Sequence, residues 1–258
     1  MTYCVAVALK AGLVFVSDSR TNAGVDNVST YSKMYGFGIP GERQFVVMSS
    51  GNLATTQAVV LQIKRDIKQG ADETLLNVEN INDAAEYIGN ISRTQQEKMT
   101  TSNGNANFEA NFIIGGQIIG HKPACYMIYP QGNYITTSQD TAYLQIGEDK
   151  YGKPILDRII TPKSSLETAT LCALVSMDST MRSNLTVGPP IEVTIYEANS
   201  LQPGRYHRFD DDSEYLREVK RTWDNLLKEA FKKLPPVAWS SNWDYKEEDD
   251  DDSSEQQF

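Results

Sequence analysis

Hydrophobic and polar positions alternate in blocks along the chain, and the first block has the pattern of strands. Apolar residues over 3–9 and 13–18 flank a Lys-Ala-Gly turn, which predicts a hairpin close to the start. Two further strands are predicted over 33–37 and 44–49, separated by a turn that contains Pro and Gly. The intervening residues 20–31 are polar and predict a loop.

The period then changes to that of a helix. Apolar residues recur at helical spacing over 52–68, with Asn52 in the position of an N-cap and Gly70 where a helix would end. A second helix is predicted over 82–99, followed by a polar loop over 100–107.

Strands and helices return in the second half in the same blockwise order. Strands are predicted over 110–119, 125–129, 134–136 and 143–147, helices over 150–159 and 165–181, and strands over 191–196 and 206–209. Blocks of strands followed by blocks of helices are typical of antiparallel sheets with helices in separate layers. The pattern therefore predicts an α+β layered sandwich, not a doubly wound parallel sheet.

The chain ends in an amphipathic helix and an acidic tail. The helix is predicted over 213–234, and its apolar stripe indicates packing either on its own domain or on a neighbouring subunit. The tail over 244–258 holds eight acidic residues and one lysine, which is −7 of the net charge of −10, and is predicted to be disordered. We accordingly expect a core domain over 2–210 and a helical extension over 211–243.

Composition excludes several classes of function. The body carries about −3, so it has no basic surface for nucleic acid, and no apolar run approaches the roughly 18 residues that span a membrane. No leader is evident, so a cytoplasmic protein is expected. Three scattered cysteines predict buried free thiols, and two isolated histidines predict neither a metal site nor a cofactor.

Candidate chemistry begins at the second residue. If Met1 is removed, Thr2 carries a hydroxyl and a free α-amine, so that one residue holds a nucleophile and its own general base. The predicted hairpin brings Asp18 close to Thr2, and Lys33 opens the next strand. A Lys33 ammonium would lower the pKa of the Thr2 amine, and Asp18 would orient Lys33. At the following strand-to-helix corner, the Gly51 N–H would stabilise an oxyanion.

Other chemistries are less well supported. The chain has no Gly-x-Ser-x-Gly elbow and no Walker loop. Gly115 and Gly116 lie in an apolar strand, where glycine indicates a bulge or a close backbone approach rather than a phosphate site.

The candidate residues lie in longer recognisable stretches. Met1-Thr2-Tyr3-Cys4-Val5, the run Ser-Asp-Ser-Arg-Thr-Asn-Ala-Gly-Val-Asp-Asn at 17–27 and the run Ser-Met-Asp-Ser-Thr-Met-Arg-Ser-Asn-Leu at 176–185 resemble the proteasome β-subunit superfamily of N-terminal-nucleophile hydrolases. They are most similar to its bacterial Anbu (ancestral β subunit) group, and the resemblance covers about residues 2–240.

The resemblance implies a four-layer αββα sandwich and a threonine nucleophile on Thr2. It also implies Asp18 and Lys33 as partners, Gly51 as oxyanion donor and Asp178 as a supporting acid. In place of the family's serine near Asp178 stands Met181, so Ser179 or Ser183 would have to substitute. A second supporting serine would fall near 147–149, where this chain has the acid Glu148.

These features predict a threonine peptidase acting on peptide or amide bonds and needing no cofactor. The resemblance implies homo-oligomers in open rings or helices, and it does not indicate whether an unfoldase partner exists. Two alternatives remain open: an amidase or transpeptidase for one small amide, and an assembly scaffold with a weak site.

Overall fold

The described part of the protein contains two five-stranded antiparallel sheets. The computed structural model describes residues 2–22, 28–102 and 107–237. The first sheet has the order β10 (Tyr143–Gly147), β1 (Tyr3–Leu9), β2 (Gly12–Asp18), β11 (Ile191–Glu197), β12 (Arg205–Phe209). The second has the order β5 (Met34–Ile39), β6 (Arg43–Gly51), β7 (Ala110–Ile118), β8 (Ala124–Ile128), β9 (Tyr134–Thr136).

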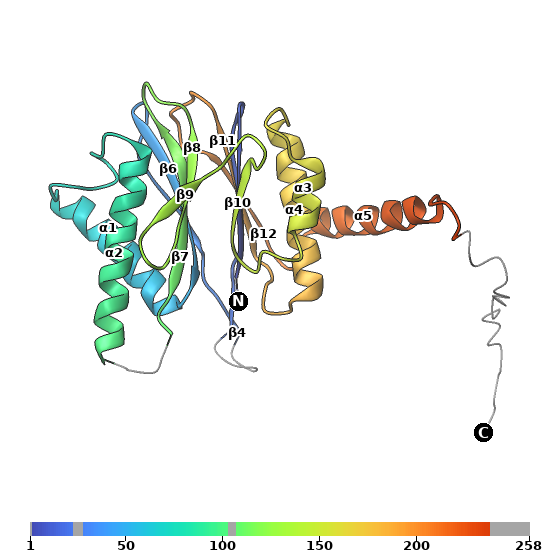
Figure 1. Ribbon diagram of the computed structural model, residues 1–258, viewed down its shortest axis with the longest axis horizontal. Helices are drawn as coiled ribbons and strands as arrows, with labels where there is room; N and C mark the ends of the chain where they lie inside the picture. Colours follow the sequence, from blue (N-terminus) through green and yellow to red (C-terminus); the bar gives the residue numbers. More distant parts are fainter. Residues whose placement is uncertain (1, 23–27, 103–106, 238–258) are drawn as a thin grey trace. The chain divides into compact units, whose positions relative to one another are not determined.

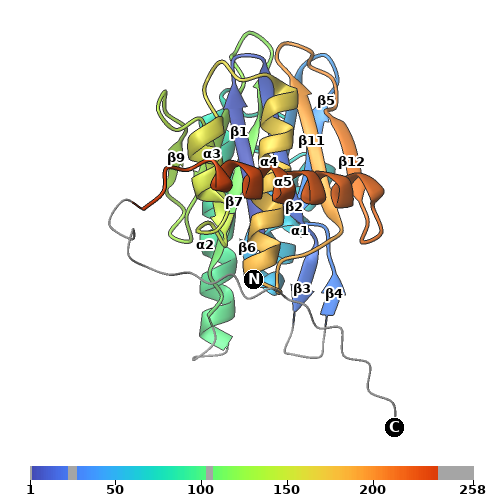
Figure 2. The same ribbon diagram turned by 90° about the vertical axis from the view of Figure 1, so that its right-hand side faces the viewer.

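Two pairs of helices cover the outer faces of the sheets (Figure 1). α1 (Leu53–Gln69) and α2 (Ile81–Ser102) pack on the second sheet. α3 (Lys153–Ile159) and α4 (Leu166–Ser183) pack on the first, and Figure 2 views the molecule from their side. The predicted αββα order of layers is confirmed.

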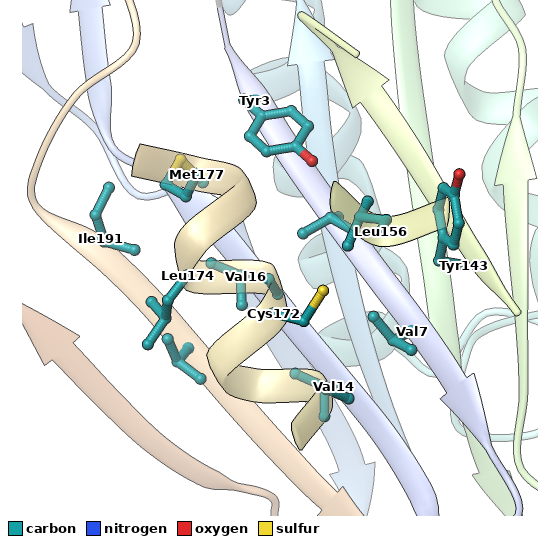
Figure 3. Packing of buried hydrophobic residues seen from close by; sticks show 14 of the residues in the cluster. Tyr3, Val7, Val14, Val16, Tyr143, Leu156, Cys172, Leu174, Met177 and Ile191 are labelled. Carbon is teal, nitrogen blue, oxygen red and sulfur yellow. The ribbon is translucent and has the colours of Figure 1, made fainter. Parts of the chain in front are cut away.

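Both faces of the central strands are buried, which explains their nearly unbroken apolar sequence. In β1, Tyr3, Val5 and Val7 point towards α3 and α4, where they meet a cluster that includes Leu156 (Figure 3). The alternate residues of β1, among them Cys4, pack between the two sheets. A strand with period two thus contributes to two separate cores.

The ends of the helices follow local signals. The Asn52 side chain accepts a hydrogen bond from the Thr55 N–H at 3.2 Å, and Gly70 ends α1 in the left-handed conformation with φ of 65°. Ser165 accepts from the Thr168 N–H at 3.0 Å and caps α4. The ends predicted at Asn52 and Gly70 are confirmed.

The paired glycines of β7 allow close packing, as predicted. A Cβ on Gly116 would lie 2.0 Å from the Gln44 carbonyl oxygen, and one on Gly115 would lie 2.5 Å from Cys125 Sγ. All three cysteines are free and buried, which also confirms the prediction.

One predicted loop contains a small ladder instead. β3 (Arg20–Asn22) and β4 (Val28–Thr30) pair antiparallel within the polar stretch over 20–31. The prediction of an irregular loop over that whole stretch is therefore wrong, because three-residue strands are too short to show a period.

The predicted C-terminal helix is present as α5 (Glu214–Lys232), and none of its residues is buried. The boundary between two compact units falls inside it, after Lys220. The acidic tail lies outside the described residues. Among the helices of the described ranges, none is long and apolar enough to cross a bilayer.

Candidate active site

Asp18 lies at the end of β2 with its side chain fully buried. One carboxylate oxygen accepts from the Tyr3 N–H at 3.0 Å and from Lys33 Nζ at 2.7 Å. The other accepts from the Gly188 N–H at 3.3 Å. Burial raises the pKa of the Asp18 carboxyl, and the Lys33 ammonium and the two backbone N–H groups oppose that rise. Asp18 thus ties together three segments that are distant along the chain.

Lys33 immediately precedes β5 and is also almost fully buried. Its ammonium donates to Asp18 and to the Arg20 carbonyl oxygen, the latter at 2.6 Å. Two oxygen acceptors from different strands therefore fix the position of the ammonium. The predicted pairing of Asp18 with Lys33 is present.

Thr2 enters the site at the start of β1 and is 8% exposed. Its carbonyl oxygen accepts from the Glu148 N–H at 2.7 Å. Gly147, with φ of 88°, lies so close that a Cβ there would be 1.9 Å from the same oxygen. Only glycine fits this position, because both the backbone angle and the space exclude a side chain.

A pocket of about 540 Å³ is lined by three of the candidate residues. Thr2, Lys33 and Gly51 all line it. Gly51 ends β6 with φ of 104°, and a Cβ there would lie 2.4 Å from the Glu109 carbonyl oxygen. The strand-to-helix corner before α1 therefore also needs glycine.

Two hydroxyl groups of lining residues have no hydrogen-bond partner in the described structure. They are Thr21 Oγ1 and Ser50 Oγ, and both are buried. Buried polar groups without partners are uncommon and costly.

Asp178 is the remaining candidate residue. It is on α4, its side chain is 13% exposed, and Lys220 Nζ is 3.9 Å from its carboxylate. It is not among the described residues that line the pocket. The structure therefore brings together Thr2, Asp18, Lys33 and Gly51, and the supporting role of Asp178 stays a prediction.

Other contacts around Thr2 were not expected from the sequence. The Tyr3 hydroxyl lies 2.6 Å from Ser176 Oγ and accepts from Gln145 at 2.7 Å. Glu148 accepts from the Asn184 amide at 3.0 Å. Neither Ser179 nor Ser183 lines the pocket. The sequence gives no signal for the contact between Tyr3 and Ser176, since the two residues are 173 positions apart in the chain.

The described residues contain no group of three or more His, Cys, Asp or Glu side chains that could hold a metal ion.

Comparison with known proteins shows the family of the chain. The model of the family described as "Proteasome subunit" matches residues 2–196. The chain belongs to the proteasome subunit family. A comparison with curated proteins gives no match.

Solved structures of Anbu proteins are similar over nearly the whole chain. The helical assembly of the Anbu complex from Pseudomonas aeruginosa is 44% identical, with a TM-score of 0.89, and the match covers 93% of this chain and 100% of that one. Anbu from Yersinia bercovieri is also 44% identical, with a TM-score of 0.85 and coverage of 91% and 98%. Anbu from Hyphomicrobium sp. strain MC1 gives 44% and 0.84, with coverage of 92% and 99%. The predicted resemblance to the Anbu group is confirmed.

Proposed function

We propose that the chain is a threonine-type N-terminal-nucleophile hydrolase of peptide or amide bonds, with Thr2 as nucleophile after removal of Met1. The observation that carries the proposal is the Lys33 ammonium, which Asp18 and the Arg20 carbonyl hold beside the pocket that Thr2 and Gly51 line. Membership of the proteasome subunit family supports it.

In the proposed reaction, Thr2 Oγ1 attacks the substrate carbonyl carbon, and the α-amine of Thr2 accepts the hydroxyl proton. The nearby Lys33 ammonium favours the neutral form of that amine by like-charge repulsion. The Gly51 N–H donates to the oxyanion of the tetrahedral intermediate.

The protonated α-amine then gives its proton to the leaving amine, and the carbon–nitrogen bond breaks. This leaves an ester on Thr2, which water hydrolyses with the same amine as base. The ester oxygen regains its proton, so Thr2 is regenerated without any cofactor.

Two measurements test the proposal together. Intact mass of the purified protein should correspond to loss of Met1, since a retained Met1 acylates the amine and removes the base. Turnover of a panel of fluorogenic peptides should be abolished by Thr2→Ala and partly retained by Thr2→Ser, which keeps a hydroxyl and the amine. Turnover that survives Thr2→Ala would refute the proposal.

Assembly is a separate part of the proposal. The Pseudomonas aeruginosa relative is described as a helical assembly, and we expect this chain to form homo-oligomers too. A catalytically weak scaffold is the second candidate, because the acid Glu148 stands where the resemblance would place a supporting serine. Assembly without turnover in a chain lacking Met1 would favour the scaffold.

A further inference from the structure

A second cavity, of about 600 Å³, lies between the two sheets. Its walls come from β2, β11 and β12 of one sheet and from β5, β6 and β7 of the other. Phe15 and Tyr196 give it aromatic surface. Ser32 lines both this cavity and the Thr2 pocket, so the two are neighbours.

The wall of this cavity contains a carboxylate whose hydrogen-bond partners are all neutral. Glu192 is 3% exposed and accepts from the hydroxyls of Ser19 at 2.8 Å, Ser32 at 3.0 Å and Tyr206 at 2.7 Å. No described lysine or arginine forms an ion pair with it. Arg208, opposite Glu192 on β12, bonds to Asp210 instead.

A buried carboxylate without a cation is unfavourable, and a positively charged ligand would relieve that cost. Aromatic surface next to a carboxylate is also the environment that proteins use to bind ammonium groups. The cavity therefore has the charge and the lining that suit an amine.

The cavity is open beside β5 because position 36 has no side chain, and the backbone there would allow one. Met34, Gly36 and Gly38 lie on one face of β5, and a Cβ on Gly36 would meet nothing within 4 Å. Gly38 differs, because a Cβ there would lie 2.4 Å from the Arg43 carbonyl oxygen. A side chain at position 36 would partly fill the cavity without a backbone clash.

One polar side chain of the lining has an atom without a hydrogen-bond partner. The Gln44 side chain lines the cavity, and its amide nitrogen is buried without a hydrogen-bond partner in the described structure. Rotation of the terminal amide would allow it to donate to an oxygen of a ligand.

We infer that this cavity is a binding site for a small primary amine with an apolar or aromatic body. The ammonium group binds Glu192, and the body lies against Phe15 and Tyr196. This site is distinct from the Thr2 pocket and does not depend on the nucleophile.

The test uses the full-length protein and 2-phenylethylamine, with 2-phenylethanol as a neutral probe of the same shape. Calorimetry or ligand-observed NMR should show that the amine binds at least about tenfold more tightly than the alcohol, a difference in binding free energy of about 1.4 kcal/mol. Glu192→Gln should reduce amine affinity at least tenfold. The matched control Glu197→Gln, at an exposed glutamate on the same strand, should not. Equal affinity for amine and alcohol would overturn the inference.

Three further variants keep the test decisive if Glu192→Gln does not fold. Gly36→Leu fills the cavity and should abolish amine binding, whereas Gly36→Ala should weaken it less. Thr2→Ala should bind the amine as the parent does. Binding that persists in Gly36→Leu, or that is lost in Thr2→Ala, would place the amine elsewhere and refute the site.

Discussion

Asp18→Asn tests whether the buried ion pair holds the site together. The substitution keeps size and shape but removes the charge that faces the Lys33 ammonium at 2.7 Å. The ammonium side chain is 7% exposed, so water cannot replace the lost partner. An asparagine has one acceptor oxygen, so it cannot serve Lys33, Tyr3 and Gly188 together.

The expected loss of folding free energy follows from these contacts. Removing one partner of a buried pair costs about 3–5 kcal/mol, and we expect about 3 kcal/mol here because Lys33 keeps its bond to the Arg20 carbonyl. The Gly188 N–H loses a long hydrogen bond of 3.3 Å, which adds about 1 kcal/mol. The total is about 4 kcal/mol.

Urea denaturation followed by circular dichroism measures this loss in a double-mutant cycle with Lys33→Met. If the charge pair is responsible, the double variant should be more stable than the sum of the single losses predicts, by about 1–3 kcal/mol. Additivity of the two losses within about 0.5 kcal/mol would refute the reasoning. As a control, Asp210→Asn removes one partner of the exposed pair with Arg208 and should cost less than about 1 kcal/mol.

Three other predictions follow from the site and its surroundings. Gly147→Ala should abolish peptide turnover and lower the melting temperature, because the new Cβ collides with the Thr2 carbonyl. The control is Gly41→Ala, at a glycine with φ of 83° and open space around it, which should cost only about 1 kcal/mol of backbone strain. Asn52→Ala should destabilise the fold by about 1 kcal/mol in urea denaturation, because α1 loses its cap. Burial raises the pKa of the Cys172 thiol to about 11, so Cys172 should resist a thiol reagent at pH 8 while the protein is folded. The contribution of this thiol to the free energy of unfolding should be full below about pH 9 and should be lost as the pH rises towards 11.

Each of these predictions has a result that contradicts it. Equal effects of Gly147→Ala and Gly41→Ala would mean that strain, not collision, dominates. An Asn52→Ala variant as stable as the parent would mean that the cap contributes nothing. Rapid labelling of Cys172 in the native protein, or a stability that does not fall more steeply above pH 9 than in Cys172→Ala, would contradict its burial.

Local signals in the sequence predict the layers well. Asn52 and Gly70 mark the ends of α1 because a cap depends on neighbouring residues only. The short strands β3 and β4 could not be predicted, since their pairing depends on the surrounding tertiary structure rather than on a period.

Some contacts of the candidate site have a local signal in the sequence and others do not. Asp18 was expected near Thr2 because a tight hairpin brings the end of one strand beside the start of the other. The donor Gly188 is 170 residues from Asp18, and Ser176 reaches Tyr3 from α4, so neither contact has a local signature. The catalytic roles stay predictions until turnover is measured.

The position of β1 between β10 and β2 has a consequence for synthesis of the chain. Tyr3 pairs with Gly147, so one edge of the first strand has no partner until about 144 more residues have been made. At about 5–20 residues per second, translation of that stretch takes on the order of ten to thirty seconds. If Met1 is removed, as proposed, an aminopeptidase has that interval to act before the sheet closes around Thr2. Slowing or speeding translation before residue 147 should therefore change the fraction of chains that carry a free threonine.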